Sequence, residues 1–510
     1  MLRVYNTLSR AKETFSPIVP GQIGIYLCGP TVYKPSHIGH MVGPVIFDAI
    51  KRYLTYSGYK VTWVVNITDV DDKLIGEANK RGLQMAQVAA EMTEDYMSNL
   101  RAMGIDTIDH FPRATDHMPG IIQFTQDLID RGFAYASDGD VYFDVGKDAE
   151  YGKLSKRSIE SLQGEGGDTA ERKRSPMDFA LWKSAKPGEP AWDSPWGRGR
   201  PGWHIECSAM SRKLLGESFD IHGGGLDLMF PHHENEIAQS ECCHGKPQAK
   251  YWMHNGLLQK SSEVGKLGGR NTREAKEGDL DSQAAAKLSK STGAAAFSDL
   301  LKQFPAETIR FFLLATHYRR PIEFSDEQIQ DKQKGLEQFY RFFARFERVT
   351  GENFYKLRFA ATRAEGDAAK SELAEEHRGR FLEAMDDDFN TGGGAGVLFE
   401  LVSALNRYID AEKLENPGQK DPAKLAALRA GTATLRELAA TMGLFREPAQ
   451  ASSAGNDELV GKLMQLLIEI RADARQSKNF ATADKVRKSL AEFGVVLEDR
   501  PDGTGWSLQK

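Results

Sequence analysis

Two histidines that flank a glycine stand near the start of the chain, in the tetrapeptide His37-Ile38-Gly39-His40. They follow an apolar run that predicts a strand, residues 24–28, and open a stretch with helical spacing, residues 38–56. The first turn of a helix offers free N–H groups and a positive dipole end, both suited to a phosphate. The pattern therefore indicates phosphate chemistry, although two histidines at the start of a helix also occur without such a role.

A basic pentapeptide, Lys287-Leu288-Ser289-Lys290-Ser291, is the second candidate for phosphate chemistry. Its two lysines and two hydroxyls could clamp a polyphosphate. Nearly the same pentapeptide, KLSKR, occurs at residues 153–157. We favour the later copy because it follows the last predicted α/β elements, whereas the earlier copy lies inside a predicted insertion. A solvated basic loop is the alternative for either copy.

The chain has four cysteines and no C-x-x-C pair, which is far too few for a disulfide scaffold. Cys28 ends the first predicted strand, and Cys207 follows the insertion. His232 and Glu236 are four residues apart and would share a helix face. Two thiolates, an imidazole and a carboxylate suit Zn²⁺. The spacing supports only the His–Glu pair, so two buried cysteines and a polar helix remain the alternative.

These residues need a frame that brings distant segments together. Residues 24–28 and 61–67 are predicted strands, and the second is apolar on both faces, which is typical of a parallel sheet. With the helix between them they predict a doubly wound, Rossmann-like α/β domain. Ligands of such sheets bind beyond the carboxyl ends of the strands, where the polar tetrapeptides CGPT and NITD stand here.

The rest of the chain changes character several times. Short predicted strands and prolines interrupt the α/β pattern, helical periodicity dominates after Ser325, and the segment EPAQASSAGN is a linker by composition. We predict a Rossmann-like catalytic domain at 1–110 and 197–324 with a lysine loop at 287–291, a connective insertion at 111–196, a helical bundle at 325–446, and a small C-terminal α+β unit at 457–510.

The composition is that of an ordinary globular protein, with 40% hydrophobic and 27% charged residues and a net charge of −6 over 510 residues. No apolar run approaches the roughly 18 residues of a membrane span, and the N-terminus lacks an apolar signal core. We therefore expect a cytoplasmic protein with no membrane partner. Residues 471–488 differ from this average charge, because they contain six basic and two acidic residues around Phe480. That segment suits an unpaired RNA base, with an amphipathic helix that buries Phe480 as the plainer alternative.

With these motifs in this order, the chain resembles the class I aminoacyl-tRNA synthetases and, more specifically, the cysteinyl-tRNA synthetases. The resemblance covers nearly the whole chain. It is carried by the histidine tetrapeptide and by the segments LCGPTVY from Leu27, NITDVDDK from Asn66, GWHIECS from Gly202, DIHGGG from Asp220, PHHENE from Pro231 and MDDDFN from Met385.

The resemblance implies ATP-dependent ligation of L-cysteine to tRNA(Cys), with Mg²⁺ accompanying ATP and one zinc ion per chain. The implied zinc ligands are Cys28, Cys207, His232 and Glu236. The implied catalytic residues are His37, His40, Lys287 and Lys290, and ATP would also contact Gly29 and Gly39. Cysteine would contact Thr31, Thr68, Trp203 and Asp227. Residues 457–510 would bind the anticodon loop, with Phe480, Asp484 and Arg487 closest. We expect a monomer.

Two alternatives stay open. A related ligase activates cysteine but transfers it to an amino-sugar, and it lacks the long C-terminal region. A non-catalytic RNA-binding homologue would usually have lost some of the motif residues. The long region after Ser325 and the complete motifs favour the tRNA ligase.

Overall fold

The computed structural model of the chain describes residues 1–157, 172–260, 296–369, 371–416, 418, 420–448, 453–500 and 503–508. The chain divides into two compact units, Met1–Glu447 and Pro448–Lys510. Within the described residues, we find no helix with the length and apolar character that a bilayer span requires.

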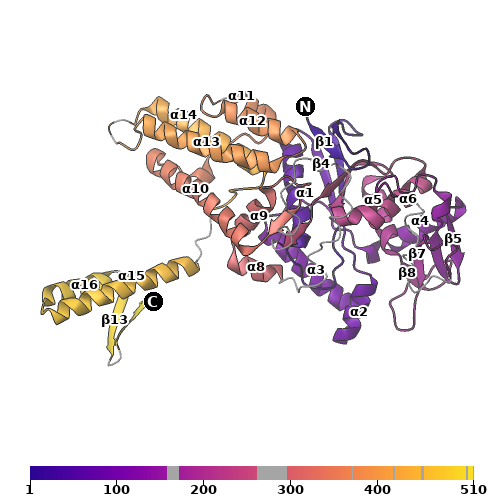
Figure 1. Ribbon diagram of the computed structural model, residues 1–510, viewed down its shortest axis with the longest axis horizontal. Helices are drawn as coiled ribbons and strands as arrows, with labels where there is room; N and C mark the ends of the chain where they lie inside the picture. Colours follow the sequence, from indigo (N-terminus) through magenta and orange to yellow (C-terminus); the bar gives the residue numbers. More distant parts are fainter. Residues whose placement is uncertain are drawn as a thin grey trace, which may run out of the picture. The chain divides into compact units, whose positions relative to one another are not determined.

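The centre of the first unit is a four-stranded parallel sheet (Figure 1). The strand order is β10-β9-β3-β4. Its strands are β3 (Gln22–Leu27), β4 (Lys60–Val65), β9 (Phe219–Gly225) and β10 (Ala249–Asn255). Ile25 and Leu27 of β3 belong to one hydrophobic core, whereas Tyr26 between them belongs to another. Burial on both faces explains why these strands are apolar without interruption. The predicted doubly wound α/β fold is confirmed.

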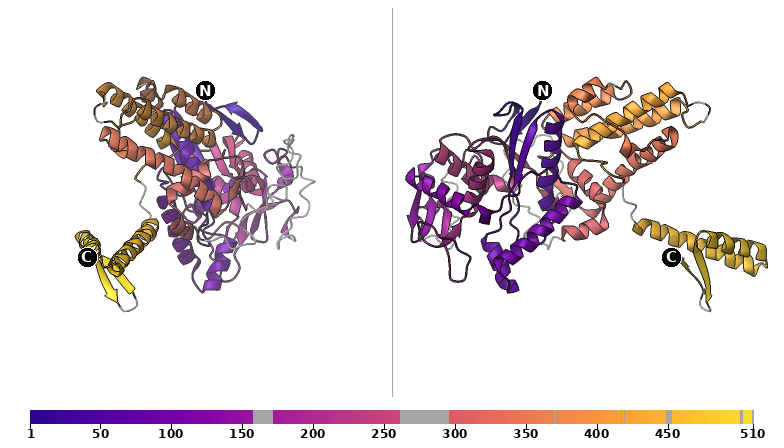
Figure 2. Two further views of the ribbon diagram at one scale, coloured as in Figure 1. Left: turned by 60° about the vertical axis from the view of Figure 1, so that its left-hand side comes forward. Right: turned by 180° about the vertical axis from the view of Figure 1, so that it is seen from behind.

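Helices cover both faces of this sheet (Figures 1 and 2). The core that contains Ile25 also receives Met41 of α1 (Gly39–Tyr56) and residues of α2 (Asp72–Arg81) and α3 (Met85–Ala102). The core that contains Tyr26 receives Ile205 of α5 (Trp203–Leu215) and Ile237 of α6 (Glu234–His244). The carboxyl ends of the strands therefore lie between two helical layers.

Two antiparallel sheets accompany the parallel one. An N-terminal hairpin pairs β1 (Arg3–Asn6) with β2 (Ala11–Thr14). After α4 (Met118–Asp130), a four-stranded sheet runs in chain order through β5 (Ala134–Ser137), β6 (Asp140–Phe143), β7 (Phe179–Ser184) and β8 (Gly199–Pro201). Lys183 of β7 pairs with Asp72 of α2 at 2.8 Å, which ties this sheet to the central domain.

Helices dominate the remainder of the first unit. Two short strands, β11 (Leu258–Lys260) and β12 (Ile322–Phe324), pair in parallel. Helices α8 (Phe297–Gln303) and α9 (Ala306–Leu314) lie between them in the sequence. The following helices are α10 (Asp326–Thr350), α11 (Arg363–Ala368), α12 (Glu375–Asp386), α13 (Thr391–Ala411) and α14 (Pro422–Thr441). Helix α10 begins where the Ser325 hydroxyl accepts the Gln328 N–H, and it ends at Gly351, whose φ of 75° few other residues adopt. The predicted helical region is confirmed.

A buried ion network joins the helical region to α1. Asp48 of α1 is fully buried and pairs with Arg310 of α9 and, at 2.8 Å, with Arg52. Arg310 also donates to the Met442 carbonyl at 2.9 Å. Burial opposes ionisation of Asp48, but the two guanidiniums outweigh it and hold the pKa of this carboxyl below its ordinary value.

We expect Arg310→Met to lower the free energy of unfolding by roughly 3 kcal/mol or more, because removal of one partner leaves a buried carboxylate only partly compensated. A matched control is Arg446→Met, since the Arg446–Asp106 pair is exposed and should contribute under about 1 kcal/mol. Urea unfolding of both variants measures the difference. Because folding lowers the Asp48 pKa, the network's contribution is complete above the carboxyl's ordinary pKa of about 4 and falls away as the pH drops below it.

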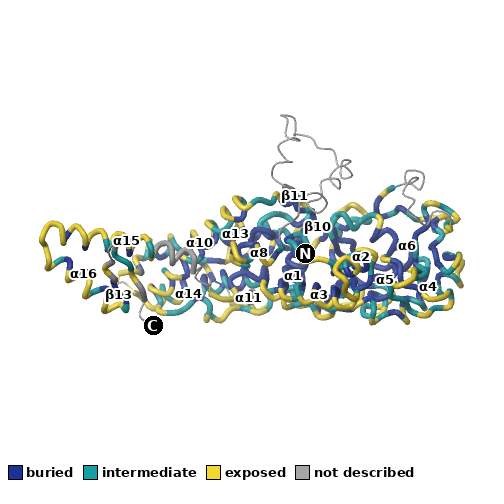
Figure 3. Tube along the Cα trace, turned by 90° about the horizontal axis from the view of Figure 1, so that it is seen from below, coloured by how far each residue is buried: buried dark blue, intermediate teal, exposed yellow. Residues whose placement is uncertain are grey.

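The second unit is small. It consists of α15 (Ser453–Gln476), α16 (Phe480–Glu492) and an antiparallel hairpin of β13 (Val495–Arg500) and β14 (Gly503–Leu508). Its core contains Met464, Leu490, Val495 and Leu497. Arg471 donates twice to Asp499, both at 2.7 Å, and so fixes α15 to the hairpin. Most of α16 is exposed (Figure 3). The predicted small α+β unit is confirmed.

Candidate active site

A pocket of about 310 Å³ opens at the carboxyl edge of the parallel sheet. It collects residues that follow β3, the first turns of α1, the start of α5 and the ends of β9 and β10. Eight of the residues predicted to act in catalysis or binding line it: Cys28, Gly29, Thr31, His37, Gly39, His40, Trp203 and Asp227. The strand-end rule therefore located the pocket correctly.

The two histidines of the tetrapeptide lie against each other at the start of α1. Their rings stack with centroids 3.9 Å apart, and His37 Nδ1 accepts the Gly39 N–H at 3.1 Å. A Cβ atom at Gly39 would stand 2.8 Å from the His37 ring, so only glycine allows this stacking. The arrangement presents two imidazoles together with the first N–H groups of α1, which is a suitable environment for a phosphate.

Four predicted metal ligands converge behind the pocket. Cys28, Cys207, His232 and Glu236 each offer a donor atom, and these atoms all lie within 4.8 Å of one another. Cys28 Sγ lies 3.8 Å from Cys207 Sγ and 3.3 Å from a Glu236 oxygen, which is 3.0 Å from His232 Nε2. The chain segments that bring them together are far apart in sequence, so the sheet and α5 and α6 do the positioning.

Charge at this donor group suits a cation. The hydrogen bond from Cys28 lowers the pKa of the buried Cys207 thiol to about 6. Burial would raise the pKa of Glu236, but His222 and His232 outweigh it and hold that pKa well below its ordinary value. Thiolates and carboxylates both bind divalent metals.

A second donor group overlaps the first and was not anticipated from the sequence. It shares Cys28 and Glu236 but replaces the other two ligands by His222 and His233. His222 Nε2 lies 2.9 Å from the second Glu236 oxygen, and His233 Nδ1 lies 2.8 Å from His254 Nε2. His222 belongs to the segment DIHGGG and His233 follows His232, but only His232 stands four residues from Glu236, so the spacing favoured the first group.

The residues predicted to hold the amino acid lie beside the donor group. Trp203 begins α5, and its ring stacks on His232 at 4.2 Å between centroids. Thr31 and Thr68 form a parallel bridge, and Thr68 is buried behind it with its hydroxyl 3.2 Å from Asn66 Nδ2. Thr68 is not among the residues that line the pocket.

The structure describes only the earlier of the two basic pentapeptides. Lys287 and Lys290 lie outside the described residues. The earlier copy wraps around a carboxylate, since Glu234 accepts N–H groups of Gly152, Leu154 and Ser155 at 3.1, 3.2 and 2.7 Å. Its Lys153 pairs with Glu150 and Glu241. The earlier copy is therefore an anchor between the insertion and α6, and none of its residues lines the pocket.

The residues predicted to contact tRNA share one face of α16. Phe480 is 60% exposed, and Asp484 and Arg487, one and two turns later, are exposed as well. The alternative that Phe480 fills the core of this unit is wrong. Arg471, however, is 3% exposed and engaged with Asp499, so it does not contribute to the exposed basic surface.

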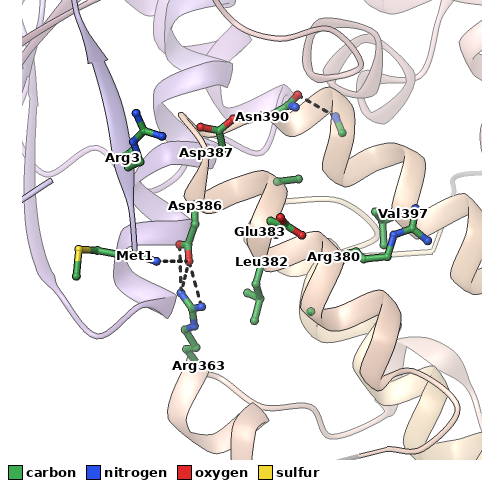
Figure 4. Close-up of a pocket in the computed structure, with 13 residues that line it drawn as sticks. Met1, Arg3, Arg363, Arg380, Leu382, Glu383, Asp386, Asp387, Asn390 and Val397 are labelled. Carbon is green, nitrogen blue, oxygen red and sulfur yellow. Dashed lines mark hydrogen bonds and ion pairs between the residues drawn. The ribbon is translucent and has the colours of Figure 1, made fainter. Parts of the chain in front are cut away.

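A larger hollow, of about 810 Å³, lies elsewhere in the first unit, between the N-terminus and helices α12 and α13 (Figure 4). It includes Asp386 and Asp387 of the segment MDDDFN, and Asp386 pairs with Arg363 at 3.1 Å and with the Met1 amino group at 3.6 Å. None of the predicted site residues is among those that line this hollow in the part of the chain that the structure describes.

Comparison with known proteins fits this geometry. Residues 14–267 match the tRNA synthetases class I (C) catalytic domain, residues 380–446 the DALR domain, and residues 464–506 the cysteinyl-tRNA ligase anticodon binding domain. The cysteine–tRNA ligase of Geobacter metallireducens is 45% identical over 517 residues, covering 100% of both chains. That of Thermococcus gammatolerans is 43% identical over 518 residues, covering 100% of this chain and 99% of the relative.

The chain belongs to the cysteinyl-tRNA synthetase family. The predicted family is confirmed, and the match across the C-terminal region favours the tRNA ligase over the amino-sugar ligase. As a member of the cysteinyl-tRNA synthetases, the chain is a ligase that uses ATP. A solved methionyl-tRNA synthetase from Mycobacterium tuberculosis, in complex with methionyl-adenylate, shares the fold with a TM-score of 0.57 at 16% identity, covering 88% of this chain and 94% of that one.

Proposed function

We propose that the chain ligates L-cysteine to tRNA(Cys) in two steps and selects cysteine through a zinc ion held by Cys28, Cys207, His232 and Glu236. In the first step the cysteine carboxylate attacks the α-phosphorus of Mg²⁺-bound ATP and pyrophosphate leaves. In the second step a terminal hydroxyl of tRNA attacks the carbonyl carbon and AMP leaves. The observation that carries the proposal is the donor group with two cysteine sulfurs directly beside a pocket lined by His37 and His40.

The donor group fits zinc by its chemistry. It offers two sulfurs, one imidazole nitrogen and one carboxylate oxygen, a set that suits Zn²⁺. Bound there, Zn²⁺ would supply a coordination position that a thiolate sulfur fills well and a neutral hydroxyl fills poorly. The Trp203 ring lies over His232, where it would exclude water from this position.

The remaining residues would act by position and charge. His37 and His40 would donate hydrogen bonds to the phosphate oxygens as charge builds on them, and Lys290 would hold the leaving pyrophosphate. Asp227 lines the same pocket and would bind the amino group of cysteine. No covalent bond to the enzyme is needed, because holding the two reactants together supplies much of the rate gain.

The decisive measurement is cysteine-dependent exchange of pyrophosphate into ATP by the purified protein. We expect exchange with cysteine and a preference over serine of about 10⁴, which corresponds to roughly 5.5 kcal/mol. Charging of tRNA(Cys) transcript in the same preparation tests the second step. Exchange that runs equally well with serine would contradict zinc-based selection. Transfer of cysteine to an amino-sugar instead of tRNA would favour the alternative, an amino-sugar ligase.

We expect Phe480→Ala to raise the KM for tRNA by about 10-fold or more, because stacking on an unpaired base contributes about 1–3 kcal/mol. Pyrophosphate exchange without tRNA should be unchanged. Phe493→Ala is the matched control, since Phe493 is 78% exposed at the other end of α16. Deletion of residues 457–510 should have a larger effect of the same kind. Equal KM values for the Phe480 and Phe493 variants would refute the assignment of this face.

We also propose that the protein acts as a monomer in the cytoplasm. Two thiols 3.8 Å apart in the donor group must stay reduced to bind a metal, which a reducing compartment ensures. Light scattering on the purified protein measures the mass of the particle.

A further inference from the structure

Asn255 has a buried acceptor atom that nothing in the described structure satisfies. It is the last residue of β10 and is 3% exposed. Its Nδ2 donates to the Gly256 carbonyl at 3.0 Å, whereas Oδ1 has no hydrogen-bond partner among the described residues. The bond to a carbonyl fixes the orientation of the amide, because only the nitrogen can donate. An unpaired buried acceptor is costly, so the free oxygen points to a ligand.

The free oxygen belongs to the wall of the active-site pocket. A Cβ atom at Gly43 of α1 would stand 3.7 Å from it, so Oδ1 lies beneath the second turn of that helix. Cys28 follows β3, two strands away from β10, and neighbouring strands lie about 4.8 Å apart. The acceptor is therefore roughly 10 Å from the thiol end of the pocket.

Several of the residues that line the pocket with Asn255 are apolar. Val42, Pro44, Leu257 and Leu258 line it together with Asn255. A flat base with apolar faces and one donor at its edge fits such a slot, whereas a ribose with two hydroxyls would leave polar groups against these side chains. The phosphate end of the nucleotide would then lie one helical turn earlier, at Gly39 and His40.

We propose that Asn255 Oδ1 accepts a hydrogen bond from the exocyclic amino group of the adenine base of ATP and thereby selects adenine. Hypoxanthine and guanine carry a carbonyl oxygen at that position, which would face another acceptor. A site built around such a hydrogen bond rejects analogues that lack the donor because its own polar group is then left unpaired. This inference rests on the proposed function, since it names the part of the same pocket that reads the nucleotide.

The test compares nucleotides in cysteine-dependent pyrophosphate exchange by the full chain. The wild type should show a KM for purine riboside triphosphate, which lacks the amino group, about 10-fold above that for ATP, and a larger rise for ITP. Asn255→Ala should raise the KM for ATP by about the same factor and no longer distinguish the two nucleotides. The KM for cysteine should change little, which a general loss of structure would not produce.

A matched control is Asn99→Ala, because Asn99 is also buried but bonds to Asp95, and neither residue lines the pocket. Equal KM values for ATP and purine riboside triphosphate in the wild type would overturn the inference without any variant. Loss of discrimination only against 2′-deoxy-ATP in Asn255→Ala would assign the acceptor to the ribose and also overturn it. Absence of all cysteine-dependent exchange would instead contradict the proposed function.

Discussion

Cys207→Ala is expected to leave the purified protein with little of its zinc and to lower cysteine-dependent pyrophosphate exchange by at least about 100-fold. Loss of a residue that only supports a metal ligand already weakens metal sites by about 10–100-fold, and a ligand matters more. Cys207 is 1% exposed and lies 3.8 Å, sulfur to sulfur, from Cys28. Elemental analysis of the purified protein measures the zinc content.

The same variant separates the two overlapping donor groups. Cys28 and Glu236 belong to both groups, so their replacement cannot tell them apart. Cys207 belongs only to the group that contains His232, whereas His222 belongs only to the other. Cys243→Ala is the matched control, because this thiol is 2% exposed but lies outside both groups. Full zinc content in Cys207→Ala, together with its loss in His222→Gln, would assign the metal to the second group.

Lys290→Ala is expected to reduce adenylate formation by about 10²–10³, the usual cost of losing one strong contact to a transition state. The contact would be to the leaving pyrophosphate, whose negative charge grows as the bond to the α-phosphorus breaks. Single-turnover formation of cysteinyl-adenylate measures the effect, and the KM for cysteine should stay close to that of the wild type.

The earlier pentapeptide provides the control for this experiment. Lys156→Ala should leave the rate nearly unchanged, because its segment is folded around Glu234 and none of its residues lines the pocket. The prediction fails if Lys156→Ala is the more damaging of the two substitutions, since the basic segment near the nucleotide would then be the earlier one.

Strand ends were the most informative feature of the sequence. Cys28 and Asn66 each follow an apolar run, and parallel strands place their carboxyl ends at one edge, so the pocket could be predicted without coordinates. The same rule applied to the apolar residues 251–253 would have drawn attention to Asn255. The sequence alone does not mark Asn255, because asparagine carries no charge and forms no recognisable spacing with other residues.

Other parts of the site depend on tertiary structure alone. Four histidines, at positions 204, 222, 232 and 233, lie close to Glu236. His222 and His232 each contact an oxygen of Glu236, whereas His204 contacts His232. Only the positions of α5, β9 and α6 in the folded chain decide these contacts. The exposure of Phe480 was equally undetermined. An amphipathic helix predicts which residues share a face, but packing against α15 and β13 decides which face of α16 is covered.

The contacts of the Glu234 carboxylate limit the sequence changes that this protein can accept. It gathers three backbone N–H groups of residues 152–155, and it stands between His232 and Glu236 in the chain. The backbone donors place no demand on side-chain identity, but Gly152 has a φ of 94° and Leu154 is fully buried, so the loop restricts both substitution and a change in length. An inserted or deleted residue there would displace the start of α6 and, with it, two of the four proposed metal ligands. The insertion and the catalytic domain must therefore evolve together at this point, although some 80 residues of chain separate the partners.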